Sequence, residues 1–227
     1  MTVEIIEPKV TLLARTEVMP AVESHMDVDD LVTHNDLLAE FAGRSCYQAH
    51  HKPNPATREN SDYIANIIRQ GHESVLEHAT ATFYIEGVSR ALTHELIRHR
   101  HLSYSQLSQR FVDEGRRAIV IPPAFRDAFG LTGCLVRDAD NAFDNYEFYV
   151  AELMSQGLKR KQAREAARAV LPNCTETKIV VTGNMRAWRG VIGLRIDPSA
   201  DAEIQEISQM ILDELREVAP ASFQDFV

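Results

Sequence analysis

The apolar residues of this 227-residue chain change their spacing several times, and this alternation restricts the fold more than any other feature. Segments 3–14, 78–88 and 176–183 alternate apolar with polar residues or are rich in β-branched residues, which is typical of strands. Other segments repeat their apolar residues every three or four positions, as amphipathic helices do. Because helices and strands interleave irregularly, we predict an α+β fold. We expect a single domain over residues 1–227, with a central mixed or antiparallel sheet flanked by helices.

Cap and turn residues set the remaining boundaries. Asn184 is a suitable N-cap for a helix, Gly71 ends an earlier helix, and acidic residues at 27–30 favour a helix start close behind them. Two short strands are expected within 110–123. Helices are expected over 28–45, 61–70, 89–100, 138–156, 159–170, 184–194 and 201–217.

The helix expected over 89–100 carries two stripes of residues that recur every four positions. Its apolar stripe consists of Val88, Leu92 and Leu96. The opposite stripe consists of Arg90, His94 and Arg98. A charged stripe is usually a solvated face, so a surface role and a binding role are both open for it. For His94, a structural role is as well supported as a binding role.

Positive charge is concentrated although the chain is acidic, with a formal net charge of -9. Segments 90–110, 159–168 and 184–195 hold twelve of the 24 Lys and Arg residues but two of the 33 Asp and Glu residues. The acidic balance argues against general nucleic-acid binding, which needs a broad basic surface. The clusters instead indicate local anion sites. Because neither common glycine-rich phosphate loop occurs, arginine side chains and helix N-termini would bind any phosphate.

The sequence has no feature of a membrane or secreted protein. No stretch approaches the roughly 20 apolar residues of a membrane span, and the N-terminal residues lack the layout of a signal peptide. The three cysteines, Cys46, Cys134 and Cys174, are far apart and form no CxxC motif. We therefore expect reduced thiols in a cytoplasmic protein.

Five histidines between residues 72 and 101 raise the question of a metal site. HESVLEH, at 72–78, looks like a zinc-protease motif, but its histidines are six residues apart and fit neither HExxH nor one helical face. We therefore expect no bound metal. His72 and His78 are left as packing residues or as neighbours of a cofactor.

The segment 98–110, RHRHLSYSQLSQR, contains Arg98-His99-Arg100 followed after seven residues by Ser108. GHESVLEH (71–78) precedes it, and ARAVLPN (167–173) and TETKIVVTGNMRAWR (175–189) follow it. With these segments in this order, the chain resembles the flavin-dependent thymidylate synthases over about residues 1–225.

The resemblance implies a methyltransferase that converts dUMP to dTMP. Methylenetetrahydrofolate would supply the carbon, reduced FAD the hydride, and NADPH would regenerate the reduced flavin. No cysteine would attack the uracil ring, which agrees with the lack of an evident catalytic cysteine. The active enzyme would be a homotetramer with FAD sites where subunits meet, and it would bind neither nucleic acid nor membrane.

The resemblance also implies which residues bind the ligands. FAD contacts are expected at Ser74, Arg98, His99, Arg100, Gln106, Asn184, Arg186 and Gly190. dUMP contacts are expected at Arg90, Glu95, Arg98, Gln106, Ser108, Gln109, Arg110, Arg168 and Arg195. Arginine suits these phosphates because its planar fork binds them bidentately and stays charged. Arg195 is also the expected catalytic residue, since a cation at the uracil edge favours the ring ionised at N3 and makes C5 more nucleophilic.

Two positions depart from the family pattern. Gly190 stands where relatives usually have His or Asn near the flavin ring, and Phe111 replaces a common Tyr. Simpler structural roles are open for other residues: Ser74 as a helix cap, Arg160 on the surface, Arg164 in either role, and Trp188, Ile192 and Leu194 in the core.

Two other functions are compatible with parts of the sequence. A metal-dependent nucleotide phosphohydrolase would use the histidines of 72–101 and would release phosphate from dUMP. An RNA- or nucleotide-binding module would use the arginine segments, and its binding would depend steeply on salt. No role follows from the sequence for His101 or Tyr104.

Overall fold

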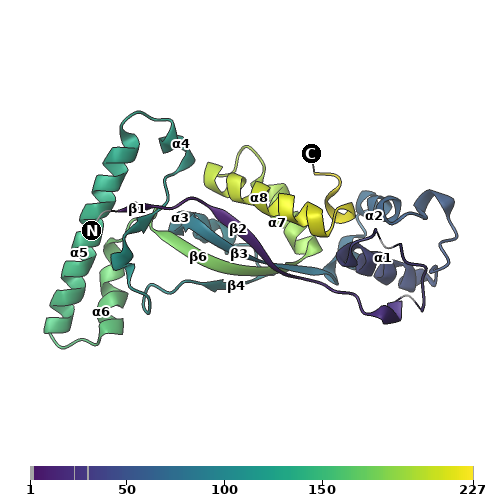
Figure 1. Ribbon diagram of the computed structural model, residues 1–227, viewed down its shortest axis with the longest axis horizontal. Coiled ribbons are helices and arrows are strands. Elements are labelled where there is room, and N and C mark those ends of the chain that lie inside the picture. Colours follow the sequence, from purple (N-terminus) through teal and green to yellow (C-terminus); the bar gives the residue numbers. More distant parts are fainter. Residues whose placement is uncertain (1–2, 23, 30, 227) are drawn as a thin grey trace.

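The computed structural model describes residues 3–22, 24–29 and 31–226. A four-stranded antiparallel sheet in the order β2-β3-β6-β4 runs through the molecule, and β1 pairs in parallel with β5 beside it (Figure 1). The α+β class with a sheet flanked by helices is confirmed. The strands are β1 (Glu4–Ile5), β2 (Lys9–Arg15), β3 (Thr80–Ser89), β4 (Leu102–Gln106), β5 (Ala118–Ile119) and β6 (Glu176–Asn184).

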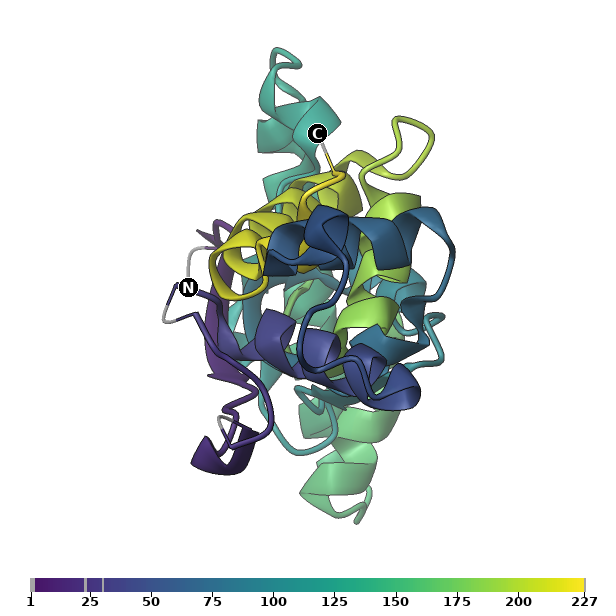
Figure 2. The same ribbon diagram turned by 90° about the vertical axis from the view of Figure 1, so that its right-hand side faces the viewer.

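The helices lie over one face of the sheet and at its two ends. In Figure 1 and Figure 2, α7 and α8 cover one face, α1 and α2 pack together at one end, and α5 and α6 pack together at the other. None of the helices in the described residues is long and apolar enough to cross a membrane. The helices are α1 (His34–Tyr47), α2 (Asn60–Arg69), α3 (Arg90–Leu96), α4 (Pro123–Arg126), α5 (Leu131–Ser155), α6 (Arg160–Ala167), α7 (Met185–Arg195) and α8 (Ala202–Val218).

The core lies between the sheet and the helices α7 and α8. Alternate residues of the two central strands are fully buried there, namely Ala81, Phe83, Ile85, Ile179 and Val181. Helix α8 contributes a stripe with helical spacing: Ile204, Ile207, Ile211 and Leu215. This arrangement is what the two periodicities of the sequence predict, because each element has one apolar face to bury.

Trp188 attaches α7 to the sheet. Its ring meets Phe83 edge-on at 5.2 Å, and its Nε1 donates to the Ala81 carbonyl at 3.1 Å. Trp188 and Ile192 are fully buried, as predicted. Leu194 is 65% exposed, so its expected place in the core was wrong: it lines a pocket beside α7.

Several boundaries differ from the sequence prediction. Helix α1 begins at His34 rather than at 28, because Thr33 is its N-cap and its side chain accepts from the Asp36 backbone N–H. Of the acidic residues expected at that helix start, Asp27 and Asp29 precede the helix, and Asp30 lies outside the described residues. Helix α5 begins earlier than predicted, and α4 was not predicted. The helix expected over 159–170 is divided into α6 and a 3-10 turn, Arg168–Val170.

The end of α3 matters most for the site. The helix stops at Leu96, so the predicted helix over 89–100 was too long, and residues 98–100 lie on the turn after it. Strand β4 follows and pairs with β6 from Leu102↔Gly183 to Gln106↔Ile179. This strand, LSYSQ, was not predicted because it is short and mostly polar. Segment 110–123 contains β5 alone, not two strands.

Arg117 connects β5 to the long helix α5. It is 5% exposed and donates to Asp140 at 2.7 Å, Asp144 at 2.7 Å and Glu147 at 3.0 Å. These acids are spaced along one face of α5. Hydrogen bonding, to Glu147 above all, raises the pKa of Arg117. One guanidinium therefore holds three positions of α5.

We expect Arg117→Met to lower the free energy of unfolding by about 2 kcal/mol, because three carboxylates lose their shared, largely buried cation. Thermal denaturation of the purified protein measures this. Arg137→Met is the matched control, since Arg137 pairs with Asp138 at 3.6 Å where both side chains are largely exposed. Equal melting temperatures for the two variants would contradict the role of Arg117.

Candidate functional site

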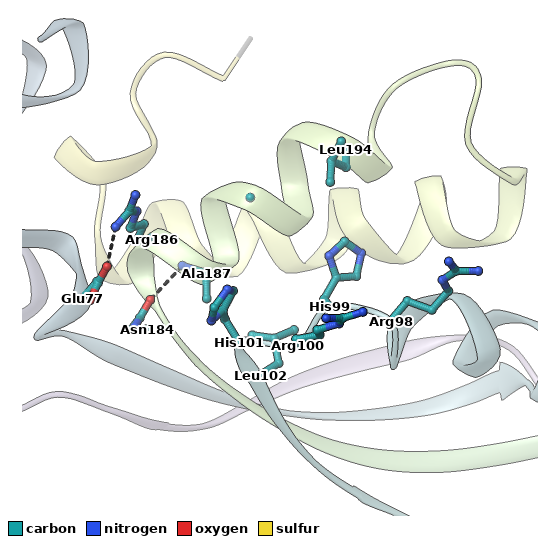
Figure 3. Close-up of a pocket in the computed structure, with 11 residues that line it drawn as sticks. Glu77, Arg98, His99, Arg100, His101, Leu102, Asn184, Arg186, Ala187 and Leu194 are labelled. Atoms are coloured by element: carbon teal, nitrogen blue, oxygen red, sulfur yellow. Dashed lines mark hydrogen bonds and ion pairs between the residues drawn. The ribbon is translucent and has the colours of Figure 1, made fainter. Parts of the chain in front are cut away.

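The turn after α3 and the face of α7 enclose a pocket of about 620 Å³, here called the motif pocket (Figure 3). Residues 98–102 come from the turn and the start of β4, and residues 184–194 come from the end of β6 and α7. Six of the eight residues expected to bind FAD line it: Arg98, His99, Arg100, Asn184, Arg186 and Gly190. The structure thus brings together two groups of residues that are about 90 positions apart in the sequence.

The motif pocket suits an anion. Arg98 and Arg100 are exposed, and neither makes an ion pair within the described part of the chain. Arg186 donates to Glu77 at 2.5 Å across the rim. Asn184 caps α7, as predicted, since its Oδ1 accepts from the Ala187 N–H at 2.8 Å. Its Nδ2 group is left available as a donor.

Gly190 leaves one wall of the motif pocket open. A Cβ built at this position would meet no atom within 4 Å. The glycine therefore makes room on the α7 side of the pocket that the Arg98-His99-Arg100 turn also lines. A volume of this size and an arginine-rich lining are compatible with a ligand that combines an aromatic ring with phosphate groups.

Arg195, at the end of α7, lies in a hydrogen-bonded cluster with the end of α3. Its Nη1 donates to the Glu95 carboxylate at 2.8 Å, its Nη2 to the Glu95 carbonyl at 3.3 Å, and its Nε to His99 Nε2 at 3.0 Å. A guanidinium has five N–H donors, so two are left for a ligand. The cluster thus fixes the cation while keeping part of it free.

Burial and the charge of Arg195 both shift the pKa values of its two partners, His99 and Glu95. Burial, and secondarily the charge of Arg195, lowers the pKa of His99. Its ring is therefore neutral at pH 7 and accepts the Arg195 hydrogen bond at Nε2, which puts its proton on Nδ1. Burial also raises the pKa of Glu95, with Asp201 adding to the effect and Arg195 opposing it.

Tyr104, for which the sequence offered no role, holds the motif turn. It projects from β4, and its hydroxyl lies 2.7 Å from the Leu96 carbonyl and 2.8 Å from the His99 carbonyl. Burial raises the pKa of Tyr104 to about 12, so it remains a donor at physiological pH. The hydroxyl thus ties the Leu96 carbonyl, which also accepts from the His99 backbone N–H at 3.2 Å, to the His99 carbonyl on the turn.

A second pocket, of about 280 Å³, lies at the other end of α3 and is here called the Arg90 pocket. Arg90, His94, Gln109 and Arg168 line it, so three predicted dUMP residues meet there. Burial lowers the pKa of Arg90; the nearby Arg168 lowers it further and Glu114 opposes both. Two cations side by side favour an anion between them. His94 therefore has a place in a candidate binding site.

The first backbone N–H groups of α3 already donate hydrogen bonds to other groups of the protein. Arg90 N–H donates to the Thr175 carbonyl, Ala91 N–H to the Asn173 carbonyl and Leu92 N–H to Ser89 Oγ. The first backbone N–H groups of this helix are thus not free to bind a phosphate. Side chains must supply the donors in the Arg90 pocket.

The remaining predicted site residues lie outside these two pockets. Ser74 lines a third pocket, of about 350 Å³, which shares Arg186 with the motif pocket. Ser74 lies inside the 3-10 helix Glu73–Glu77, whose N-cap is His72, so Ser74 is not a helix cap.

Three expected dUMP residues also lie outside the two main pockets. Gln106 donates to Thr93 at 2.9 Å beneath α3. Ser108 and Arg110 line none of the three pockets, and Arg110 pairs with Glu165 at 3.8 Å on the surface.

Arg164 has a structural role, which the sequence left open. It is buried and donates to the Phe111 carbonyl at 2.9 Å and to Asp113 at 2.5 Å. Phe111 itself is 62% exposed, and Lys161 lies over its ring. Arg160 is exposed, as expected.

None of the three cysteines lines the motif pocket or the Arg90 pocket, whereas Cys46 lines the pocket that contains Ser74. Cys46 and Cys134 are exposed, and Cys174 is buried, which raises its pKa. No group of three His, Cys, Asp or Glu residues in the ranges 3–22, 24–29 and 31–226 is arranged to hold a metal ion.

The family model and the individual relatives that match this chain point to the same family. Residues 30–221 match the family model described as thymidylate synthase complementing protein. A flavin-dependent thymidylate synthase of Mycobacteroides abscessus is 49% identical, over 98% of this chain and 91% of its own length. Proteins of the same name from Mycobacterium tuberculosis and Mycobacterium avium are each 50% identical, over 96% and 98% of this chain.

We expect Tyr104→Phe to loosen the motif turn, because two carbonyls lose their shared donor while the ring stays in place. Backbone amide exchange in residues 97–101 should become faster by roughly fivefold, which corresponds to about 1 kcal/mol. Hydrogen–deuterium exchange measures this. Tyr149→Phe is the control, since Tyr149 is 41% exposed on α5. Unchanged exchange at the turn would contradict the role of Tyr104.

Proposed function

Because this chain belongs to the family of thymidylate synthase complementing proteins, we propose that it is a flavin-dependent thymidylate synthase. It methylates dUMP to dTMP with a flavin. The observation that carries the proposal is the motif pocket, where residues of the Arg98-His99-Arg100 turn face α7 and two arginines have no ion pair within the described residues. The Arg195 cluster adjoins this pocket through His99.

FAD is the flavin that the pocket lining favours. The bound flavin would supply the hydride for the new methyl group. Arg98 and Arg100 would neutralise its phosphates, and Asn184 Nδ2 would donate to it. Arg186 lines both the motif pocket and the pocket that contains Ser74, so a long dinucleotide could extend from one into the other. This continuity supports Ser74 as a phosphate contact.

The Arg90 pocket is the proposed site of the dUMP phosphate. A nucleotide monophosphate brings roughly two negative charges at neutral pH, and Arg90 and Arg168 lie together there with Gln109 as a polar neighbour. Arg98 and Gln106 would contact the rest of the nucleotide along α3. The position of Glu95 on this helix supports its place beside the uracil ring.

Arg195 would act on the pyrimidine through its charge. Glu95 and His99 hold the guanidinium with three hydrogen bonds, so little reorganisation accompanies the reaction. A cation fixed at the uracil edge favours the ring ionised at N3 and raises the electron density at C5. No cysteine is needed for this activation, and none lines the motif pocket or the Arg90 pocket.

The remaining features follow from the family resemblance. Methylenetetrahydrofolate would be the carbon donor and NADPH the final reductant. Residues 1–227 would form one domain of a cytoplasmic homotetramer with FAD at subunit interfaces. The exposed arginines of the motif pocket support this assembly, as do Ser108 and Arg110, because a neighbouring subunit would bring a pocket to them.

One experiment tests the function directly. The purified protein should be yellow, dUMP should perturb its flavin absorbance, and tritium should be released from C5-labelled dUMP in the presence of NADPH and methylenetetrahydrofolate. A colourless protein that FAD does not reconstitute would contradict the proposal. Phosphate release from dUMP with stoichiometric metal would instead indicate a phosphohydrolase, and salt-dependent oligonucleotide binding would indicate an RNA-binding module.

We expect Arg195→Ala to retain FAD but to lower kcat for dTMP formation on the order of 10²–10³-fold, because a preorganised cation is lost from the site. Flavin content and turnover are measured on the same preparation. Arg137→Ala, on the exposed face of α5, should leave both unchanged. Near-normal turnover of Arg195→Ala would remove Arg195 from the catalytic role.

A further inference from the structure

The corner between α7 and α8 holds the short helix α3 at two points. Arg195, the last residue of α7, binds Glu95 near the end of α3. Glu203, in the first turn of α8, binds Ser89 at its start. Helix α3 has seven residues and connects the Arg90 pocket to the motif pocket. The first contact belongs to the site described above, whereas the second has no assigned role.

Glu203 holds Ser89 with both carboxylate oxygens. Oε1 accepts from the Ser89 backbone N–H at 2.7 Å, and Oε2 accepts from Ser89 Oγ at 2.6 Å. Ser89 is 3% exposed, so water does not compete freely for these bonds. Such charge-assisted hydrogen bonds are about twice as strong as neutral ones. They fix both the backbone and the side-chain rotamer of Ser89.

Ser89 is the residue at which strand β3 becomes helix α3. Its Oγ, while donating to Glu203, accepts from Leu92 N–H at 3.1 Å and so caps the helix. Helices this short have few internal hydrogen bonds and depend on contacts at their ends. The direction in which α3 leaves the sheet is therefore set by the Ser89–Glu203 pair together with the bonds from Arg90 N–H and Ala91 N–H to the Thr175 and Asn173 carbonyls, and of these the Ser89–Glu203 pair alone fixes the capping side chain.

Arg90 immediately follows this cap, and its own side-chain contacts are weak. Its guanidinium lies 3.4 Å from the Leu107 carbonyl and 3.4 Å from Thr177 Oγ1, both at the long limit for hydrogen bonds. The position of the guanidinium is thus set largely by its backbone. His94, one helical turn later, depends on the same helix direction.

We propose that Glu203 is a positioning residue for the phosphate of the nucleotide substrate. It does not line the Arg90 pocket; it acts through Ser89, which orients Arg90 and His94 toward that pocket. This inference rests on the proposed function, since it takes the anion of the Arg90 pocket to be the dUMP phosphate. It assigns a role to a residue outside the motif segments of the sequence.

The test compares dUMP with deoxyuridine, which lacks the phosphate. In the flavin-loaded enzyme, Glu203→Ala should raise the Kd and KM for dUMP roughly fivefold, the factor typical of losing a helix cap. Its kcat should change by less than about threefold, because Arg195 is still held. The affinity for deoxyuridine, measured by competition, should stay within about twofold of the wild-type value, whereas a general structural defect would weaken both ligands equally.

Glu206→Ala is the matched control. Glu206 lies on the same helix and also accepts two bonds from one partner, Arg126, at 3.0 Å each, but within the described residues it makes no hydrogen bond with α3. This variant should keep wild-type dUMP affinity. Glu203→Gln keeps the size of the side chain and one acceptor for Ser89, so its dUMP affinity should fall by about threefold. This variant replaces Glu203→Ala in the test if the alanine variant does not fold.

Two results would overturn the inference. One is wild-type dUMP affinity in folded Glu203→Ala, or in Glu203→Gln if the alanine variant is not folded. The other is an equal loss of affinity for dUMP and deoxyuridine. Failure of the proposed function is seen separately, because the wild-type enzyme would then not bind dUMP at all.

Discussion

The antiparallel pairing of β3 with β6 is the constraint on which the rest of the site depends. The paired strands run from Thr80↔Asn184 to Ser89↔Glu176, so the helix after each strand starts at an opposite end of the sheet. Helix α3 follows Ser89, and α7 follows Asn184 and extends about 16 Å back along the sheet. The two helices consequently approach each other, and Arg195 at the end of α7 reaches Glu95 and His99. A parallel pair of strands would not bring these ends together.

The placement of acidic residues decides what each cation does. Arg117 and Arg164 are buried and face carboxylates, and Arg189 forms a two-bond pair with Asp225 at 2.7 and 2.8 Å. These arginines hold elements together. Arg98 and Arg100 have no such partner within the described residues and face the motif pocket. The concentration of arginine in the sequence therefore marks structural ion pairs as well as anion sites, and the tertiary structure shows which arginines are buried beside acids and which face a pocket.

Much of the fold was predictable because the central elements have strong periodicity. Strands β3 and β6, the capped start of α7 and the length of α8 agree with the alternation and cap residues of their segments. Strand β4 and the early end of α3 were not predictable. The strand is a polar segment that exists through its pairing with β6, and the helix ends at Leu96, where Tyr104 binds the Leu96 carbonyl and the His99 carbonyl of the turn that follows. In both cases a contact with another part of the chain overrides local preference.

By itself, the sequence determined the fold class, the family and most residues of the motif pocket, since these depend on local spacing and on the order of short segments. The tertiary structure decided which arginines are free, how Arg195 is held and what orients α3. The contacts responsible join residues far apart: Arg195 with His99 across 96 positions, and Ser89 with Glu203 across 114. Local periodicity carries no information about such pairs, because they arise only when packing of the apolar faces brings the elements together.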